Sequence, residues 1–185
     1  MSAETMLHFL NNCTPEEKFG FRVVTQCAPV LKGVKISNLI TMKPGGWHKI
    51  RAYLKKSRII CIPLYADAEK EVLFLYRYEQ LERHLKNREV REFLRSCGYE
   101  SFEVASVLVR LRRRYQLYAG ISKEFPHELG VLLGYPVRDM RHASKDCSPR
   151  RDFDTVGAPA LIIYGSHAAR RKFIAILPDR GHVVR

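Results

Sequence analysis

Two strongly apolar runs, joined by a short polar link, limit what this chain can fold into. The runs span residues 58–65 and 71–77, and the link between them reads Ala-Asp-Ala-Glu-Lys. β-Branched, aromatic and leucine side chains dominate both runs, which is typical of strands, and the link favours a hairpin. Because neither run alternates with polar residues, both faces of the hairpin need a cover of other elements. The sequence therefore predicts a buried hairpin between layers of helices.

Other segments supply those helices and further strands. Thr14-Pro15-Glu16-Glu17 opens a helix with a capping box, and Gly33 is the predicted stop beyond Pro29. Apolar periodicity predicts more helices over residues 3–11, 47–54, 79–86, 88–97, 102–118, 125–134 and 166–176. Strands are expected over residues 38–42 and 160–164.

This order of elements predicts one α/β domain, with α+β as the alternative, over residues 1–177. We expect a mixed sheet of about four strands, packed with helices. Residues 178–185 are expected to be a frayed tail.

Several classes of protein are disfavoured by what the sequence lacks. No apolar stretch approaches the ~20 residues of a membrane span, and no secretory signal opens the chain. The five cysteines show no C-x-x-C or zinc-site spacing, so we expect reduced thiols, no metal site and a cytoplasmic protein. Phosphate-loop, dinucleotide-binding and serine-hydrolase motifs are missing as well, and the sequence specifies no cofactor.

The charge balance favours an anionic partner. Lys and Arg number 32 against 19 Asp and Glu, which gives a formal net charge of +13. Residues 1–76, 77–120 and 121–185 carry net charges of +5, +4 and +4, so on this division the excess is diffuse.

One dense basic cluster lies in the predicted helix 102–118. It consists of Arg110, Arg112, Arg113 and Arg114. These side chains predict phosphate contacts and hence one alternative function, nucleic-acid binding. A solvated face paired with carboxylates is the competing interpretation.

Three stretches resemble a known bacterial family. They are Cys27–Leu39, with the sequence CAPVLKGVKISNL, the strand LFLYR at residues 73–77, and FPHELGVLLGYP at residues 125–136. Together they resemble the family called domain of unknown function 3793, found mainly in clostridia and related bacteria. After residue 140 the chain departs from the family pattern, with Arg-His-Ala at residues 141–143.

The first and third stretches predict a shared ligand site. Its expected polar contributors are Cys27, Lys35, Asn38, Arg77, His127, Glu128 and Tyr135. In the predicted helix 125–134, Phe125 and Leu129 should anchor one face in the core. Glu128 should then support the start of the helix, while His127 faces a cleft beside residues 27–38. Gly130 and Gly134 predict close packing on this helix, because glycine there is otherwise costly.

These observations predict a small cytoplasmic binding or accessory protein that recognises a small anionic ligand or a protein partner. A second hypothesis is an enzyme that uses His127 and Glu128, or Cys27, as its reactive groups. The resemblance implies redox or iron-linked chemistry for such an enzyme. The third hypothesis is the nucleic-acid binder with the arginine-rich helix.

Pro44-Gly45-Gly46 precedes a predicted helix and has Lys43 and Lys49 beside it. Backbone N–H groups at a helix start can hold an anion. This turn is therefore a further candidate anion site, although most turns of this composition serve only to reverse the chain.

Overall fold

A central hairpin forms where the two apolar runs predict it. The computed structural model describes residues 11–122 and 124–143. Strands β2 (Ile59–Ala66) and β3 (Glu71–Arg77) pair antiparallel, with an irregularity between Pro63 and Tyr65. In the turn, the Asp67 carboxylate accepts hydrogen bonds from the backbone N–H groups of Glu69 and Lys70, both at 2.8 Å. An aspartate that binds the backbone two or three residues onward stabilises a tight reversal.

The sheet has three strands within the described residues, and all of them are antiparallel. Strand β1 (Ser37–Met42) pairs with β3, which gives the order β1-β3-β2. Within the described residues both neighbouring pairs run in opposite directions, so this part of the sheet is antiparallel rather than mixed and has three strands rather than about four. The fourth predicted strand, residues 160–164, lies outside the described residues. Mixed helix and strand content is confirmed, and the antiparallel sheet favours the α+β alternative.

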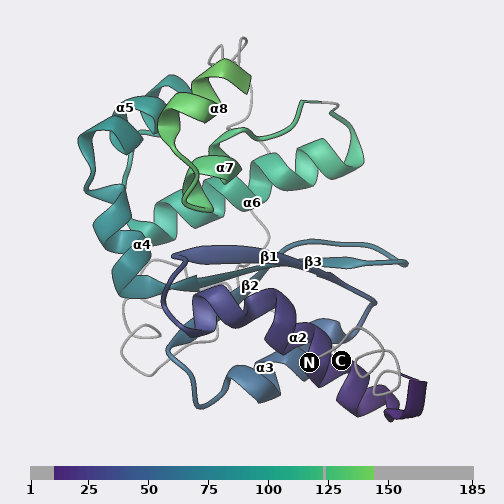
Figure 1. Cartoon of the computed structure of the whole chain (residues 1–185). Helices are drawn as coiled ribbons and strands as arrows, with labels where there is room; N and C mark the ends of the chain where they lie inside the picture. Colours follow the sequence, from purple (N-terminus) through teal and green to yellow (C-terminus); the bar gives the residue numbers. More distant parts are fainter. Residues whose placement is uncertain (1–10, 123, 144–185) are drawn as a thin grey trace, which may run out of the picture.

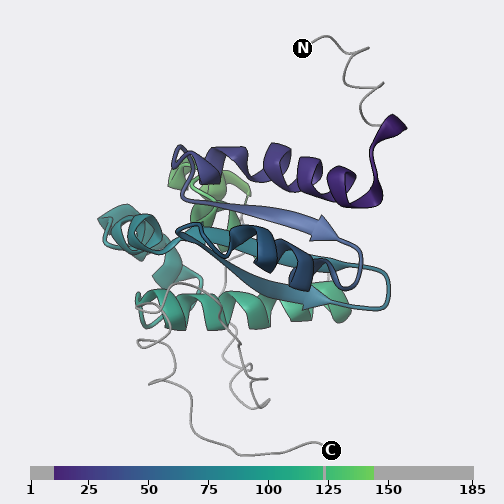
Figure 2. The ribbon, with the colours of Figure 1, turned by 90° about the horizontal axis from the view of Figure 1, so that it is seen from below.

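Helices cover both faces of the sheet (Figure 1). On one face lie α4 (Tyr78–Leu85), α5 (Arg88–Ser96), α6 (Val104–Gly120), α7 (Glu128–Leu132) and α8 (Val137–Ala143). On the other face lie α2 (Pro15–Leu31), beside β1, and α3 (Gly46–Leu54), beside β2 and β3 (Figure 2).

Alternate strand residues feed two separate cores. Phe74 and Tyr76 point into the core beneath α4–α7, while Leu73 and Leu75 point into the core above α2 and α3. All four are at most 1% exposed. Each face of the hairpin therefore buries apolar side chains, which explains why its sequence does not alternate with polar residues.

The ends of α2 follow the local signals of the sequence. Thr14 Oγ1 accepts from the backbone N–H of Glu17, and the Glu17 carboxylate accepts from the backbone N–H of Thr14. The predicted capping box is thus confirmed. Pro29 lies inside the last turn, and the chain leaves the helix through Gly33, whose φ is +74°. A positive φ at this point favours glycine.

The helix predicted over residues 125–134 is shorter than expected. Only Glu128–Leu132 is helical, and Phe125 is 41% exposed rather than anchored in the core. Leu129 is fully buried, as predicted. The difference arises because residues 125–127 form an irregular approach to α7.

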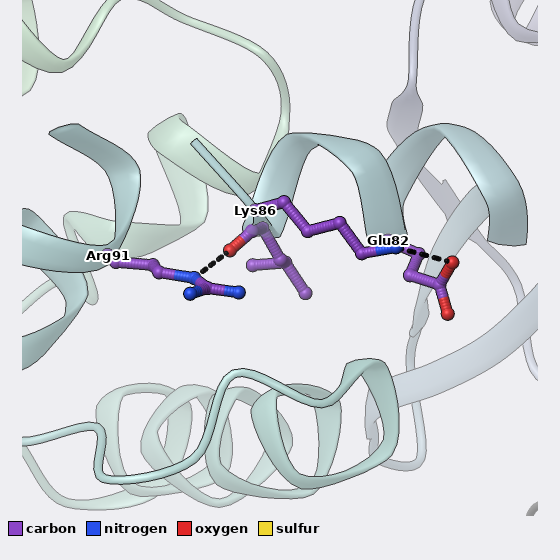
Figure 3. A network of polar contacts seen from close by, with 4 residues as sticks. Glu82, Lys86 and Arg91 are labelled. Atoms are coloured by element: carbon purple, nitrogen blue, oxygen red, sulfur yellow. Dashed lines mark hydrogen bonds and ion pairs between the residues drawn. The ribbon is translucent and has the colours of Figure 1, made fainter. Parts of the chain in front are cut away.

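The corner between α4 and α5 is held by local polar contacts (Figure 3). Arg91 Nε donates to the carbonyl oxygen of Leu85 at 2.8 Å, which satisfies a carbonyl at the end of α4. Lys86 and Glu82 form an ion pair at 3.3 Å, but their side chains are 65% and 41% exposed. Such a pair contributes little stability, so the carbonyl contact matters more at this corner.

Candidate functional sites

Two of the predicted ligand-site residues fasten α2 to the sheet. Arg77, at the end of β3, donates from Nε to Val30 O at 2.7 Å and from Nη2 to Leu31 O at 2.5 Å. Asn38 Nδ2 donates to Gln26 O at 2.6 Å. The two Arg77 donors satisfy carbonyl groups in the last turn of α2, where helical N–H partners run out, and Asn38 binds a carbonyl one turn earlier. Arg77 and Asn38 thus have a clear structural task.

The thiols of Cys27 and Cys61 lie in the core between the sheet and the α2–α3 layer. Burial raises the pKa of Cys27 to about 11 and also raises the pKa of Cys61. Since the thiolate is the nucleophile, a raised pKa works against covalent chemistry by Cys27 near neutral pH. The expectation that Cys61 is buried within a strand is confirmed.

The first and third family-like stretches do meet, at the end of α7. Ser37 Oγ donates to Leu132 O at 2.6 Å. The Lys35 ammonium lies 5.3 Å from the ring centroid of Tyr135. A Cβ atom on Gly134 would lie 3.2 Å from Ile36, and its φ is +88°. The contact between the stretches is therefore close packing, with Lys35 and Tyr135 at its edge.

His127 and Glu128 lie in different surroundings. The His127 ring is 5.7 Å from that of Phe125, whereas Glu128 is fully buried. Glu128 Oε1 accepts from the Tyr99 hydroxyl at 3.1 Å and is ion-paired with Arg114. Glu128 thus links α7 to α6 through Tyr99 and Arg114 rather than through His127.

The four arginines of α6 are partly buried within the helical layer. Arg114 pairs with Glu128, and the Arg110 guanidinium lies 5.2 Å from the Tyr99 ring centroid. Burial lowers the pKa of Arg112 from its ordinary range. Two of the four therefore already have defined contacts inside the protein, which reduces the open basic surface that α6 offers.

The candidate anion site at Pro44-Gly45-Gly46 is filled by a side chain of the protein. Glu71 Oε1 accepts from Gly45 N at 2.9 Å, and Glu71 Oε2 accepts from Trp47 N at 2.7 Å. The N–H groups at the start of α3 therefore bind an internal carboxylate, as the helix dipole favours. This contact also joins α3 to β3.

The layout of the fold changes the interpretation of the charge. Residues 18–66 contain no Asp or Glu. Acidic residues occur only up to the first turn of α2 and again after the end of β2. This segment contains ten basic residues: Lys18, Arg22, Lys32, Lys35, Lys43, Lys49, Arg51, Lys55, Lys56 and Arg58. The positive charge is therefore concentrated at the scale of this segment, although the three longer portions carry similar net charges. The division at residues 76 and 120 placed the acidic residues on both sides of this segment in the same portion as the segment itself.

These residues lie on α2, on α3 or in the turns beside them, and the two helices form one layer on the same face of the sheet (Figure 2). We call the exposed ones the basic face: Lys18, Arg22, Lys32, Lys43, Lys49, Lys55, Lys56 and Arg58. Arg22 also donates to Thr41 O at 2.7 Å, which holds its guanidinium beside β1. No sequence motif marks this face, but a search for segments without acidic residues finds it.

An aromatic pair joins α2 to α3 within the basic face. The rings of Phe19 and Tyr53 are 5.7 Å apart, and the Lys49 ammonium lies 5.8 Å from the Phe19 ring centroid. Tyr53 is 47% exposed. A large, exposed ring beside lysines provides both a stacking surface and positive charge.

The described residues therefore define a small α+β protein with helices on both sides of an antiparallel sheet and a basic face on one of them. The chain belongs to the family described as protein of unknown function DUF3793, whose profile matches residues 23–148. The predicted resemblance is thus confirmed. No curated protein and no solved structure matches the chain.

Two further features concern membranes and metals. Across residues 11–122 and 124–143, no helix is both long and apolar enough to cross a bilayer. Within the same part of the chain, no three His, Cys, Asp or Glu side chains are grouped so that they could share a metal ion.

Proposed function

We propose that this protein is a cytoplasmic accessory protein that binds single-stranded nucleic acid through the basic face. The observation that carries the proposal is the acid-free segment 18–66, whose charges come together on the α2–α3 layer. Phosphate groups release bound counterions when lysine and arginine neutralise them, which favours association without sequence preference. The hypothesis of an anionic partner is kept. The proposed binding site, however, is on the α2–α3 face of the sheet and not on α6 or at the family-like stretches.

The aromatic pair favours a single strand over a duplex. Unpaired bases can stack on exposed aromatic rings, and proteins that bind single strands combine such rings with a positive surface. Tyr53 provides the exposed ring, with Lys49 on the same helix one turn before it. A duplex would present its phosphates to the lysines but would leave Tyr53 without a base to stack on.

The apolar side chains of α2 and α3 are buried in the core, which argues against an anionic membrane as the partner. On α3, Ile50 and Leu54 are buried against the sheet, and on α2 the same is true of Val23 and Val30. A helix that lies in a membrane interface needs a broad apolar face directed at the lipid. Here the apolar faces of both helices are already used by the core.

Removal of three positive charges from the basic face is expected to weaken binding strongly. The variant is Lys49→Gln/Lys55→Gln/Lys56→Gln, and the assay is fluorescence anisotropy with labelled 20-nucleotide oligo(U) at 50 and 200 mM KCl. Each lost phosphate contact should flatten the slope of log affinity against log salt by about 0.7. We therefore expect at least tenfold weaker binding at 50 mM KCl and a slope flatter by about 2.

The control removes the same charge from the other side of the sheet. Lys86, Arg88 and Arg138 are exposed on the α4–α8 side, and their replacement by glutamine should leave oligo(U) affinity nearly unchanged. An equal loss in both triple variants would overturn the proposal, since it would indicate attraction by net charge alone. Stronger binding to anionic phospholipid vesicles than to oligo(U) would also overturn it.

Tyr53→Leu tests the stacking contribution separately from charge. Loss of one stacked base is expected to cost about 1–3 kcal/mol of binding free energy, with the salt slope unchanged. Leucine retains apolar contact with Phe19, so circular dichroism and the melting temperature should stay close to wild type. Unchanged affinity of the variant for oligo(U) would exclude Tyr53 as a stacking platform.

A further inference from the structure

A concave site lies on the other side of the sheet from the basic face. It is a cavity of about 480 Å³ between the turn end of the β2–β3 hairpin and the C-terminal end of α6. Tyr65, Lys70 and Val72 line it from the hairpin, while Tyr115, Tyr118 and Ser122 line it from α6 and the residues that follow. Its volume falls within the range of small-molecule sites, about 300–1,000 Å³.

We infer that this cavity binds a small planar aromatic molecule that carries one anionic group. The inference is independent of nucleic-acid binding by the basic face, because the two sites share no residue and lie on opposite sides of the sheet. Three tyrosines and one lysine in a single cavity of this size supply the two kinds of contact that such a molecule needs.

The tyrosine rings provide the surface for the planar part. Tyr115 and Tyr118 meet edge to face, with centroids 5.7 Å apart and an interplanar angle of 74°. The same arrangement continues from Tyr118 to Phe125, at 5.2 Å and 87°. Perpendicular rings allow a flat ligand to stack on one ring while its edge contacts the next.

The hydroxyl groups of the cavity act as neutral hydrogen-bonding groups. Burial raises the pKa of Tyr115, and the hydrogen bond with Asp67 raises the pKa of Tyr65. Both phenols therefore keep their protons near neutral pH. The cavity thus lacks the phenolate charges that would repel an anionic ligand.

Lys70 provides the positive charge, and the nearby carboxylate is already occupied. Asp67 accepts from the backbone N–H groups of Glu69 and Lys70, and these bonds, with the Tyr65 hydroxyl and the positive charge of Lys70, lower its pKa. Among the described residues, no hydrogen bond or ion pair involves the Lys70 ammonium. The ammonium is therefore placed to meet the anionic group of a ligand.

Isothermal titration calorimetry of the full chain tests the inference with four probes. Uridine 5′-monophosphate and 4-hydroxybenzoate combine a ring with an anion, uridine has only the ring, and inorganic phosphate has only the anion. At least one of the two combined probes should bind at least tenfold more tightly than uridine and phosphate. The better of the two then shows whether the anionic group is a phosphate or a carboxylate.

Variants locate the binding in this cavity. Lys70→Gln should weaken binding of the combined probe at least tenfold and leave the affinity for uridine unchanged. Tyr118→Leu should weaken binding of both. Ala119 also lines the cavity from α6, so Ala119→Phe, which would fill it, tests the same point if Tyr118→Leu does not fold. Lys49→Gln and Tyr53→Leu, on the basic face, should leave probe binding unchanged.

Four results would overturn the inference, and the first three concern the probes and the cavity variants. The first is that neither combined probe binds at millimolar concentration. The second is that uridine binds as tightly as the combined probes. The third is that Lys70→Gln and Ala119→Phe both bind the combined probe as tightly as wild type. Loss of probe binding in the basic-face variants would also overturn it, because the probes would then occupy the other site. None of these results depends on whether oligo(U) binds.

Discussion

Arg114→Met is expected to lower the free energy of unfolding by about 3–5 kcal/mol. Arg114 is the cationic partner of Glu128, whose side chain is fully buried between α6 and α7. Glu128 Oε1 also accepts from the Tyr99 hydroxyl, but Oε2 has no hydrogen-bond partner among the described residues. Loss of the guanidinium would leave a buried charge with a single neutral donor, which is far costlier than loss of an exposed ion pair.

Urea denaturation at pH 7 measures this effect, and a second variant separates charge burial from packing. The double variant Arg114→Met/Glu128→Leu removes both charges and should recover most of the lost stability, because apolar residues can replace a buried pair at little cost. A free energy of unfolding of Arg114→Met within about 1 kcal/mol of the wild-type value would contradict the expectation. It would mean that water or another cation compensates Glu128.

Gly130→Leu is expected to destabilise the protein by about 1–3 kcal/mol, through overpacking. A Cβ atom on Gly130 would lie 2.1 Å from Met140 Sδ and 3.2 Å from Met140 Cγ, so even one carbon displaces that side chain. Tyr135 N also donates to Gly130 O at 3.0 Å, which limits movement of the backbone. The remaining atoms of leucine would have to push α8 away from α7.

Gly120→Ala is the matched control, since Gly120 ends α6 and a Cβ atom there meets nothing within 4 Å. Alanine should be neutral or stabilising by up to about 1 kcal/mol, because it favours the helix. Thermal unfolding followed by fluorescence of Trp47 compares the two variants. Identical midpoints for Gly130→Leu and wild type would show that α7 and α8 separate easily.

The sequence predicted the hairpin and most helix ends because their causes are local. Residues 71–77 form a strand with the expected bounds, and Thr14 and Glu17 form the expected capping box. The helix at α7 was predicted too long because Phe125 and Pro126 fit an amphipathic helix pattern, although neither residue is helical in the structure and Phe125 is exposed. The antiparallel direction of β1 was not predicted. It follows from the pairing of β1 with β3, and apolar content alone does not specify that partner.

The candidate sites were harder to predict, for a different physical reason. A polar residue between apolar ones can meet a ligand or satisfy a backbone group inside the fold. Arg77 and Glu71 both do the second, at the end of α2 and at the start of α3. The basic face was visible in the sequence as a segment without acidic residues, but only the α2–α3 layer shows that its charges lie together.

The contact between Arg77 and α2 also bears on the order of folding. Arg77 reaches back 46 residues to Leu31 O, so α2 gains these hydrogen bonds only after β3 is in place. The β2–β3 hairpin closes through a short turn, whereas β1 and α2 join it through contacts distant in sequence, which form more slowly. During synthesis α2 is made early, yet its docking waits for the end of β3. The nucleic-acid surface that we propose would therefore be assembled only after both strands of the hairpin have left the ribosome.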